Sequence, residues 1–257
     1  MKNSIKSTAI TTALLMALSS TGFAQEATRT FDYSDFSKIE LSTSADLKVT
    51  IDDEYSIIVT GDEDRINRME IDKSGDELEI SSKGRGFSLF GRNNDGYVNV
   101  TITMPDIEEM EINGSGDAEI FGIDNEEILL NINGSGDLYV TGKSESVVIE
   151  INGSGDVEMD EVAGDDVFIE INGSGNVEFD GGQCNRLEIE VEGSGDIDAK
   201  DLICKEVEIE VDGSGNSRVY ATDTLIFESE GSGKVDVFGK PKNVQDRTKR
   251  KSKIRIR

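Results

Sequence analysis

The sequence predicts an all-β protein, a single-stranded parallel β-helix (β-solenoid) with about 20 residues per coil. Three observations favour this fold class. A Gly-Ser-Gly tripeptide recurs seven times, apolar and polar residues alternate on both sides of it, and every copy runs in the same direction.

The Gly-Ser-Gly tripeptides mark the corners of the predicted coils. They begin at positions 114, 134, 153, 173, 193, 213 and 231, so the spacings are 20, 19, 20, 20, 20 and 18 residues. Asp or Asn follows the first six copies, and Lys234 follows the last. Glycine allows the chain to turn tightly at such corners. Seven equivalent copies indicate a fold repeat, since a catalytic serine would occur once.

The segments between the corners alternate with a period of two, which is typical of strands. Ile149 and Ile151 precede one corner, and Val157 and Met159 follow it. Short strands with glycine turns also suit an antiparallel sandwich. Antiparallel neighbours would reverse the motif from strand to strand, so the uniform direction favours parallel coils stacked about 4.8 Å apart.

The region before Gly114 is less regular, and we expect the first coils there. Apolar residues alternate between Ile39 and Val59, and residues 42–46 (Ser-Thr-Ser-Ala-Asp) resemble a degenerate corner. A Gly-rich insertion at 83–96 interrupts two strand patterns and carries five residues of a candidate contact loop: Arg85, Phe87, Leu89, Phe90 and Arg92. Two interpretations stay open, a cap over the first coils or a contact with a partner or membrane surface.

The two ends of the chain suggest three segments. Residues 1–24 have the features of a signal peptide, with Lys2 and Lys6 before a short apolar run and small residues up to Ala24. Residues 25–242 form the predicted β-helix head domain, and 243–257 form a basic C-terminal tail. No later run reaches the roughly 20 apolar residues of a membrane-spanning helix, so we expect no transmembrane segment and export to the periplasm, the outer cell surface or the medium.

Charge divides the exported chain into an acidic body and a basic tail. Without Lys2 and Lys6, 24 basic residues face 53 acidic ones. Seven of those basic residues lie in the last eleven positions, which leaves 17 against 53 in residues 25–246. Such a body disfavours nucleic acid, whose binding needs clusters of Lys and Arg. The plausible partners are cations, cationic proteins or envelope glycans.

The basic tail admits two structures. By default it is disordered or pairs with the acidic body. Alternatively, the alternating Lys253-Ile254-Arg255-Ile256-Arg257 forms a strand that covers the open edge of the last coil.

The order of these motifs resembles the putative auto-transporter adhesin head GIN domain family of secreted bacterial proteins. The resemblance covers roughly residues 30–240. It rests on the early corner with Asp46, the strand 97–105 ending at Pro105, the run of Gly-Ser-Gly-Asp corners, and the closing Val237–Lys242. The family implies a single-stranded parallel β-helix and supplies no catalytic residues.

The chain offers little for catalysis. It has no His, no nucleophile elbow, no phosphate loop and no Cys cluster. We therefore expect a non-enzymatic, adhesin-like binding or structural module of the cell envelope that needs no cofactor. Two alternatives stay open: a carbohydrate-active β-helix enzyme with paired carboxylates, and a purely structural protein that self-associates into homo-oligomers.

An acidic ladder is the candidate cation site. Position three before each corner is occupied by Glu in four successive coils, and stacking would bring these carboxylates about 4.8 Å apart. These residues are Glu150, Glu170, Glu190 and Glu210. Screening by solvent and salt is one explanation of how the fold tolerates them. Binding of calcium, which takes several oxygen ligands, is the other.

Two further ladders have structural explanations. Asn113, Asn133, Asn152 and Asn172 precede successive corners, where stacked amides hydrogen-bond along a parallel array. The Asp or Asn after each corner accepts hydrogen bonds from nearby backbone amides.

The two cysteines, Cys184 and Cys204, are each nine residues before a corner glycine, so they occupy equivalent positions on adjacent coils. Stacking would put their Cα atoms within the range of a disulfide, in an oxidising compartment. Parallel Cβ directions make a relaxed bridge harder to form, and buried free thiols are the alternative. We expect these cysteines to form a disulfide. Its role is structural and not redox, because the spacing lacks the Cys-x-x-Cys pattern of an oxidoreductase.

Overall fold

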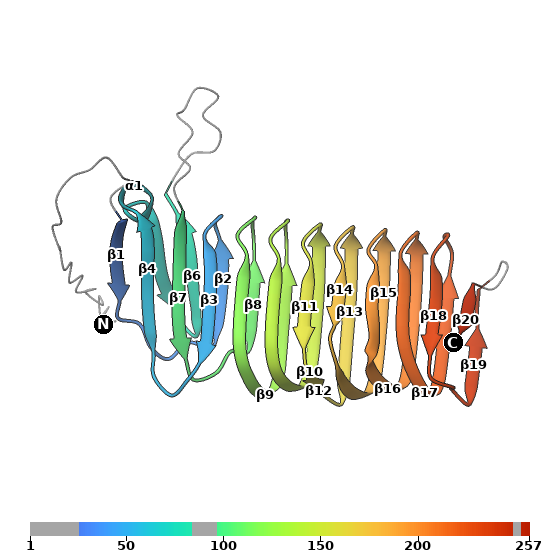
Figure 1. The fold of residues 1–257 in the computed structure, drawn as a ribbon. Coiled ribbons are helices and arrows are strands. Elements are labelled where there is room, and N and C mark those ends of the chain that lie inside the picture. Colours follow the sequence, from blue (N-terminus) through green and yellow to red (C-terminus); the bar gives the residue numbers. More distant parts are fainter. Residues whose placement is uncertain (1–25, 84–96, 249–252) are drawn as a thin grey trace, which may run out of the picture.

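The structure is a computed structural model of the whole chain and describes residues 26–83, 97–248 and 253–257. Figure 1 shows a long stack of coils in which two sheets face each other along the whole length. It confirms the predicted fold class, because the repeat region consists of parallel coils about 20 residues apart and helix is almost absent from the described residues. The expected signal peptide, residues 1–24, lies outside the described residues.

The first elements are β1 (Glu26–Phe31), β2 (Lys38–Ser42), β3 (Asp46–Ile51), β4 (Ser56–Asp62), α1 (Glu63–Ile66), β5 (Met69–Ser74), β6 (Glu77–Ser82) and β7 (Val98–Met104). The repeat region contains β8 (Glu109–Ile112), β9 (Ala118–Ile132), β10 (Leu138–Gly153), β11 (Val157–Asp160), β12 (Val162–Ala163), β13 (Asp166–Gly173), β14 (Val177–Phe179), β15 (Gly182–Gly193), β16 (Ile197–Gly213), β17 (Asn216–Ser229) and β18 (Lys234–Phe238). The last strands are β19 (Asn243–Asp246) and β20 (Ile254–Ile256).

Each coil has two long sides that meet at the glycine corner. We call the strands before the corner the leading face and those after it the trailing face. The leading face runs β5, β6, β2, β8, the second halves of β9 and β10, β13, β15, the second halves of β16 and β17, and β19. The trailing face runs β1, β4, β7, β3, the first halves of β9 and β10, β11, β14, the first halves of β16 and β17, β18 and β20.

The core consists of the inward members of the alternating pattern, stacked in register. Ile151 lies beside Ile171, which lies beside Val191, and all three are buried. Each residue therefore contacts its own equivalent in the next coil, and the repeat in sequence becomes an aliphatic ladder in space.

The corners require glycine for a packing reason. A Cβ placed on Gly193 would lie 2.2 Å from the carbonyl oxygen of Gly173 in the coil below, and Gly193 has φ +136°. The backbone amides of Ser194 and Ser214 donate to the corner glycines one coil back, each at 2.8 Å. The glycines of each corner therefore lie too close to the coil below to carry a Cβ, which explains why glycine recurs at these positions.

The N-terminal coils differ from the expectation of simple parallel winding. β2 and β3 do form a parallel coil, and the corner-like segment 42–46 stacks beneath the first glycine corner, where the carbonyl of Thr43 accepts from Gly116. β4, with Ile57 and Val59, instead runs antiparallel to β7, and β1 and β5 are also antiparallel to their neighbours. These reversed strands, with Ile66 of α1 buried against them, end the core at this side.

The last coil follows the second structure considered for the tail. β19 pairs with β17, and β20 pairs with β18, both in parallel. Residues 243–246 and 254–256 thus continue the two faces beyond position 242. The alternating Ile254 and Ile256 explain this, because they extend the inward lane of Val235 and Val237.

Candidate functional site

The four glutamates of the acidic ladder stack in register on the leading face. Glu150 pairs with Glu170, Glu170 with Glu190, and Glu190 with Glu210. Burial, followed by the charges of Glu170, Glu188 and Glu210, raises the pKa of Glu190 above its ordinary value. Repulsion between the stacked carboxylates of the ladder therefore contributes to this shift.

The described residues contain no group of three or more acidic or thiol side chains arranged to hold a metal ion. The chain itself places cations beside the C-terminal part of the ladder. Arg186 contacts Glu188 and Glu208 at 2.9 and 3.3 Å, and Arg247 contacts Glu208 at 3.1 Å. Binding of calcium by Glu150, Glu170, Glu190 and Glu210 stays a prediction.

The asparagine ladder beside it forms the expected chain of amide hydrogen bonds. Asn133 donates to Asn113 at 3.0 Å, Asn152 donates to Asn133 at 3.1 Å, and Asn172 donates to Asn152 at 3.2 Å. Asn172 also donates to Glu170 at 2.8 Å. This ladder ties adjacent coils together and is structural.

The Asp and Asn residues after the corners link consecutive coils. The Oδ1 atom of Asp137 accepts from the backbone amide of Asp156 at 2.9 Å, and Asp156 accepts from Asn176 at 2.8 Å. The same bond joins Asp117 to Asp137, Asn176 to Asp196, and Asp196 to Asn216. Sequence reasoning identified the acceptors but not that the donor belongs to the next coil. Each Asp uses its Oδ1 atom for this bond to the next coil, and its Oδ2 atom takes no part in it.

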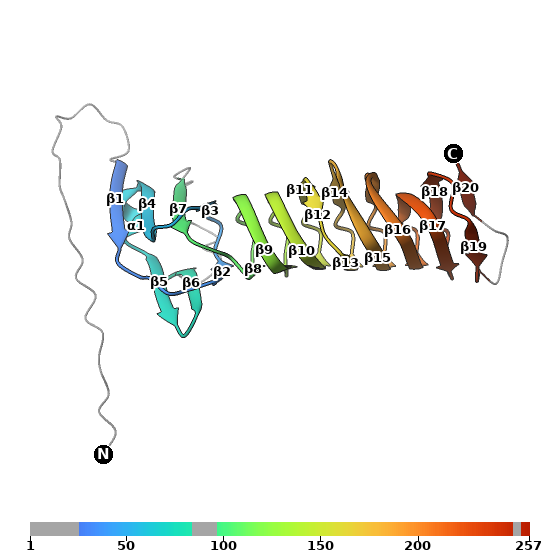
Figure 2. The same cartoon turned by 90° about the horizontal axis from the view of Figure 1, so that it is seen from below.

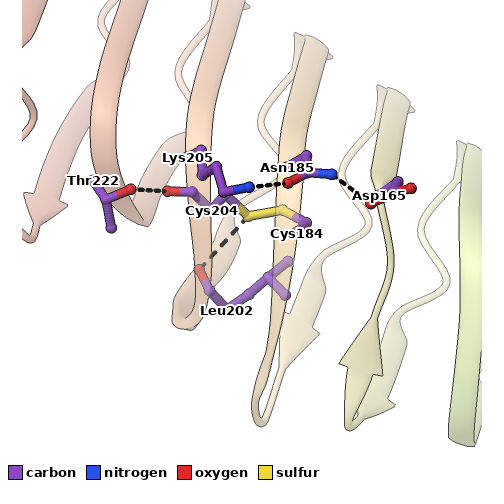
Figure 3. The surroundings of a disulfide bond; sticks show 7 residues. All are labelled: Asp165, Cys184, Asn185, Leu202, Cys204, Lys205 and Thr222. Carbon is purple, nitrogen blue, oxygen red and sulfur yellow. Dashed lines mark hydrogen bonds between the residues drawn. A yellow bond between two sulfur atoms is a disulfide. The ribbon is translucent and has the colours of Figure 1, made fainter.

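Cys184 and Cys204 are joined by a disulfide in the structure, with their Cα atoms 4.5 Å apart (Figure 3). Both side chains are buried, and their positions pair in register between β15 and β16. Around them a polar row crosses the coils, in which Lys205 donates to Asn185 at 2.6 Å and Asn185 donates to Asp165. The bridge therefore joins two adjacent coils from within the core.

The candidate contact loop, with Arg85, Phe87, Leu89, Phe90 and Arg92, lies outside the described residues. Its flanking strands are described. β6 belongs to the leading face and β7 to the trailing face, and they lie beside β2 and β3 respectively. The end of β6 and the start of β7 lie beside residues 42 and 46, at the side of the stack where other coils have their glycine corner.

Sequence reasoning did not predict a groove that runs along the trailing face. The groove has a volume of about 890 Å³ and is lined by residues from eight successive coils. At roughly 4.8 Å per coil, it extends for about 30 Å along the solenoid. Nine carboxylates line it: Asp117, Glu119, Asp137, Asp156, Glu158, Glu178, Asp196, Asp198 and Asp236. Sequence alternation shows which side chains point outward. It does not show whether the outer surface of a coil is flat or hollowed, so the groove could not be assigned from the sequence.

The two halves of this groove differ in charge. At the C-terminal half, Asp198 binds Lys200 and Arg218 at 3.0 and 2.6 Å, and Asp236 binds Arg257 at 2.8 Å. Among the described residues, the other seven carboxylates form no ion pair. The groove therefore has an acidic half, from Asp117 to Glu178, whose six carboxylates form no ion pair within the described part of the chain, and a compensated half that begins with the coil of Asp196 and Asp198.

Two groups in the acidic half have shifted pKa values. Burial, followed by the charges of Asp180, Glu178 and Asp160, raises the pKa of Glu158. Burial and the charges of Asp160 and Glu158 likewise raise the pKa of Tyr139, whose half-buried ring packs edge-on against Phe121. A ligand that brings positive charge here would relieve this repulsion.

The order of coils, corners and closing strands is shared with known proteins. The family model of the putative auto-transporter adhesin, head GIN domain, matches residues 35–241. The chain belongs to this family. The resemblance to the head GIN domain family that the sequence suggested is thereby confirmed. An adhesin family indicates an exported or surface protein, and no helix in the described residues is long and apolar enough to cross a membrane.

Several solved structures share the head GIN fold. A "putative lipid binding protein" from Parabacteroides distasonis is 24% identical, with a TM-score of 0.78 and coverage of 90% of this chain and 96% of that one. A "putative adhesin" from Parabacteroides merdae is 20% identical, with a TM-score of 0.83 and coverage of 92% and 98%. Another from P. distasonis is 19% identical, with a TM-score of 0.81 and the same coverage. These likenesses establish the fold. A comparison with curated proteins finds no match.

Proposed function

We propose that this protein is a non-enzymatic, adhesin-like module of the cell envelope that binds an extended, positively charged ligand along the trailing-face groove. The observation that carries the proposal is the run of six carboxylates from Asp117 to Glu178 in the acidic half of that groove, which form no ion pair among the described residues. Membership of an adhesin family supports a binding role.

The shape of the groove favours a linear ligand. Its lining repeats once per coil, so a chain lying along the solenoid axis would meet similar side chains at about 4.8 Å intervals. Each Asp of the corner lane is held by a hydrogen bond to the next coil, as between Asp137 and Asp156 at 2.9 Å. Such fixed carboxylates lose little freedom on binding, which lowers the entropic cost of association.

Its charge favours a cationic ligand, such as a basic protein segment or an amino-bearing glycan. Net negative potential along a surface groove attracts cations and speeds their association. The compensated half, with Arg218, Lys234 and Arg255, gives the groove a direction. We expect a bound ligand to place its cationic part beside Asp117–Glu178 and any anionic end beside these three residues.

Binding is tested on an array that carries cationic peptides, amino glycans and neutral or acidic glycans. The groove variant Asp137→Asn, Asp156→Asn and Glu178→Gln should lose most of its binding to cationic probes. A matched control on the leading face, Glu150→Gln, Glu170→Gln and Glu210→Gln, removes the same number of charges and should retain it. Equal losses in both variants would show that net charge, and no particular groove, attracts the probes.

A carbohydrate-active enzyme is the second candidate, and Glu158 is the observation that favours it. Burial, together with the charges of Asp180, Glu178 and Asp160 around it, raises the pKa of Glu158, and glycosidases use such paired carboxyl groups. We expect no turnover of array ligands by the wild-type protein. Cleavage of a glycan that stops in Glu158→Gln would replace the binding proposal with this one.

A further inference from the structure

One outward lane of the trailing face carries charge of both signs. Its members pair in register from each coil to the next: Lys48, Glu119, Tyr139, Glu158, Glu178, Asp198, Arg218, Asp236 and Arg255. At the N-terminal end of this lane, Lys48 pairs with Glu119. At the other end, Arg218 binds Asp198 at 2.6 Å. The chain therefore supplies its own cations at both ends of the lane.

The middle of the lane holds an aromatic side chain beside carboxylates that lack a cation. Tyr139 is the only aromatic residue that lines the groove in the described part of the chain. It pairs with Glu158 of the next coil, and Glu158 pairs with Glu178. Neither glutamate forms an ion pair with a described residue, and the hydroxyl of Tyr139 forms no hydrogen bond with one. An aromatic ring and two carboxylates are therefore left for a ligand.

The neighbouring coils show how this surface holds a cation. Lys48 of β3 places its ammonium group 4.5 Å from the ring centre of Phe121 of β9. Phe121 packs edge-on against Tyr139 of β10, with the two ring centres 5.9 Å apart. These three strands follow one another along the stack (Figure 2). A cation is attracted to the face of an aromatic ring within about 6 Å of its centre. Phe121 has its lysine, whereas Tyr139 meets no cation among the described residues.

Negative charge gathers around the ring of Tyr139. Burial, followed by the charges of four carboxylates, raises the pKa of its hydroxyl group. These carboxylates belong to Asp160, Glu158, Asp180 and Glu119. A cation against this ring would meet the π-face and these carboxylates together, and it would offset the repulsion between them.

We propose that Tyr139 and Glu158 form a subsite of the groove that seats one lysine side chain of a basic peptide, with the ammonium group between the ring and the carboxylate. The inference rests on the proposed binding of an extended cationic ligand and narrows that ligand to a peptide. A polysaccharide would present a similar ring at every unit, whereas the lining offers one aromatic platform. The ammonium group of lysine sits on a flexible four-carbon stem, so it can reach the ring from a backbone that lies above the groove. Lys48 reaches Phe121 from another coil in the same way.

The subsite is tested by calorimetric titration with hexalysine at constant ionic strength. Tyr139→Leu should raise the dissociation constant at least about threefold, and Tyr139→Phe, which keeps the ring, should bind within about twofold of wild type. The matched control Tyr220→Leu removes a half-buried tyrosine that does not line the groove and should leave the constant unchanged. Tyr139→Leu with Glu158→Gln should lose less than the product of the two single losses, because both side chains hold the same ammonium group.

Nuclear magnetic resonance of the wild-type complex tests the contact without relying on a variant that folds. Nuclear Overhauser effects should join the lysine ε-methylene protons to the ring protons of Tyr139, whose resonances are assigned by their change in Tyr139→Phe. Unchanged affinity in Tyr139→Leu, with loss of binding in the groove variant, would overturn the subsite and leave the proposed function standing. A wild-type protein that does not bind hexalysine would overturn both. A glucosamine hexamer whose affinity depends on Tyr139, while that of hexalysine does not, would overturn the assignment of a peptide.

Discussion

The close approach of the glycine corners gives a prediction whose magnitude follows from the structure. In Gly193→Ala the added Cβ would lie 2.2 Å from the carbonyl oxygen of Gly173. Close C···O contacts in proteins are about 3.3 Å, so the two corners must separate by about 1 Å. Alanine also disfavours φ +136°, and an unfavourable backbone conformation costs about 1–3 kcal/mol.

Separation of the corners also weakens their hydrogen bonds. The amide of Ser194 donates to Gly173, and the amide of Ser214 donates to Gly193, both at 2.8 Å. Loss of one such bond costs about 1 kcal/mol. We therefore expect Gly193→Ala to lower the free energy of unfolding by about 3 kcal/mol. For a chain of this size the melting temperature would fall by about 6–12 °C.

The assay is thermal unfolding followed by circular dichroism, with Gly181→Ala as the matched control. A Cβ added at Gly181 would meet no heavy atom within 4 Å, so this substitution should change stability by less than about 0.5 kcal/mol. A Gly193→Ala protein as stable as the control would refute the reasoning, since the corners could not then be stacked as closely as described.

The remaining predictions concern the ladders and the disulfide. Asp156→Ala should lower the free energy of unfolding by about 1–2 kcal/mol, because the backbone amide of Asn176 loses its acceptor; Asp156→Asn keeps an acceptor and should unfold close to wild type, and equal losses would speak against the inter-coil bond. The raised pKa of Glu190 means that its ionised form opposes folding. Glu190→Gln should therefore unfold at a higher denaturant concentration than wild type at pH 7, and this gain in stability should shrink as the pH falls towards 4.5. A gain that does not depend on pH would exclude the charge of Glu190 as its cause. If the glutamate ladder binds calcium, millimolar calcium should raise the melting temperature more than sodium chloride of equal ionic strength does. The double variant Glu170→Gln with Glu190→Gln should show the same melting temperature in both salts. Equal effects of the two salts on the wild type would leave screening as the explanation. Denatured protein isolated without reductant should contain no alkylatable thiol, and Cys184→Ser with Cys204→Ser should lose about 3 kcal/mol of stability; two reactive thiols per wild-type chain would refute the bridge.

The repeat region could be predicted almost residue by residue, and the physical reason is its period. Once Gly173 and Gly193 are assigned to stacked corners, every residue between them has a defined neighbour 20 positions away. The pairing of Glu170 with Glu190 and of Cys184 with Cys204 follows from that single assignment.

The ends and the groove could not be predicted in this way. The strand β4 alternates like any coil strand, and its reversal is decided by the need to close the core at the N-terminal side. The insertion of β2 between β6 and β8 breaks the sequential order, and no local pattern records it. The groove is lined by residues of successive coils, for example Asp156 and Glu158 beside Asn176 and Glu178, and alternation alone does not show that this face is hollowed.

Binding of an extended cationic ligand in the groove is tested most directly by the length dependence of affinity. Oligolysines of increasing length serve as the probe, titrated calorimetrically at constant ionic strength against the wild-type protein and against Asp137→Asn with Asp156→Asn and Glu178→Gln. The affinity of the wild type should rise with each added unit until the probe spans the acidic half of the groove, and the variant should lose this rise. An affinity that is already maximal for the shortest probes, or that rises equally in both proteins, would contradict a groove that binds along its length.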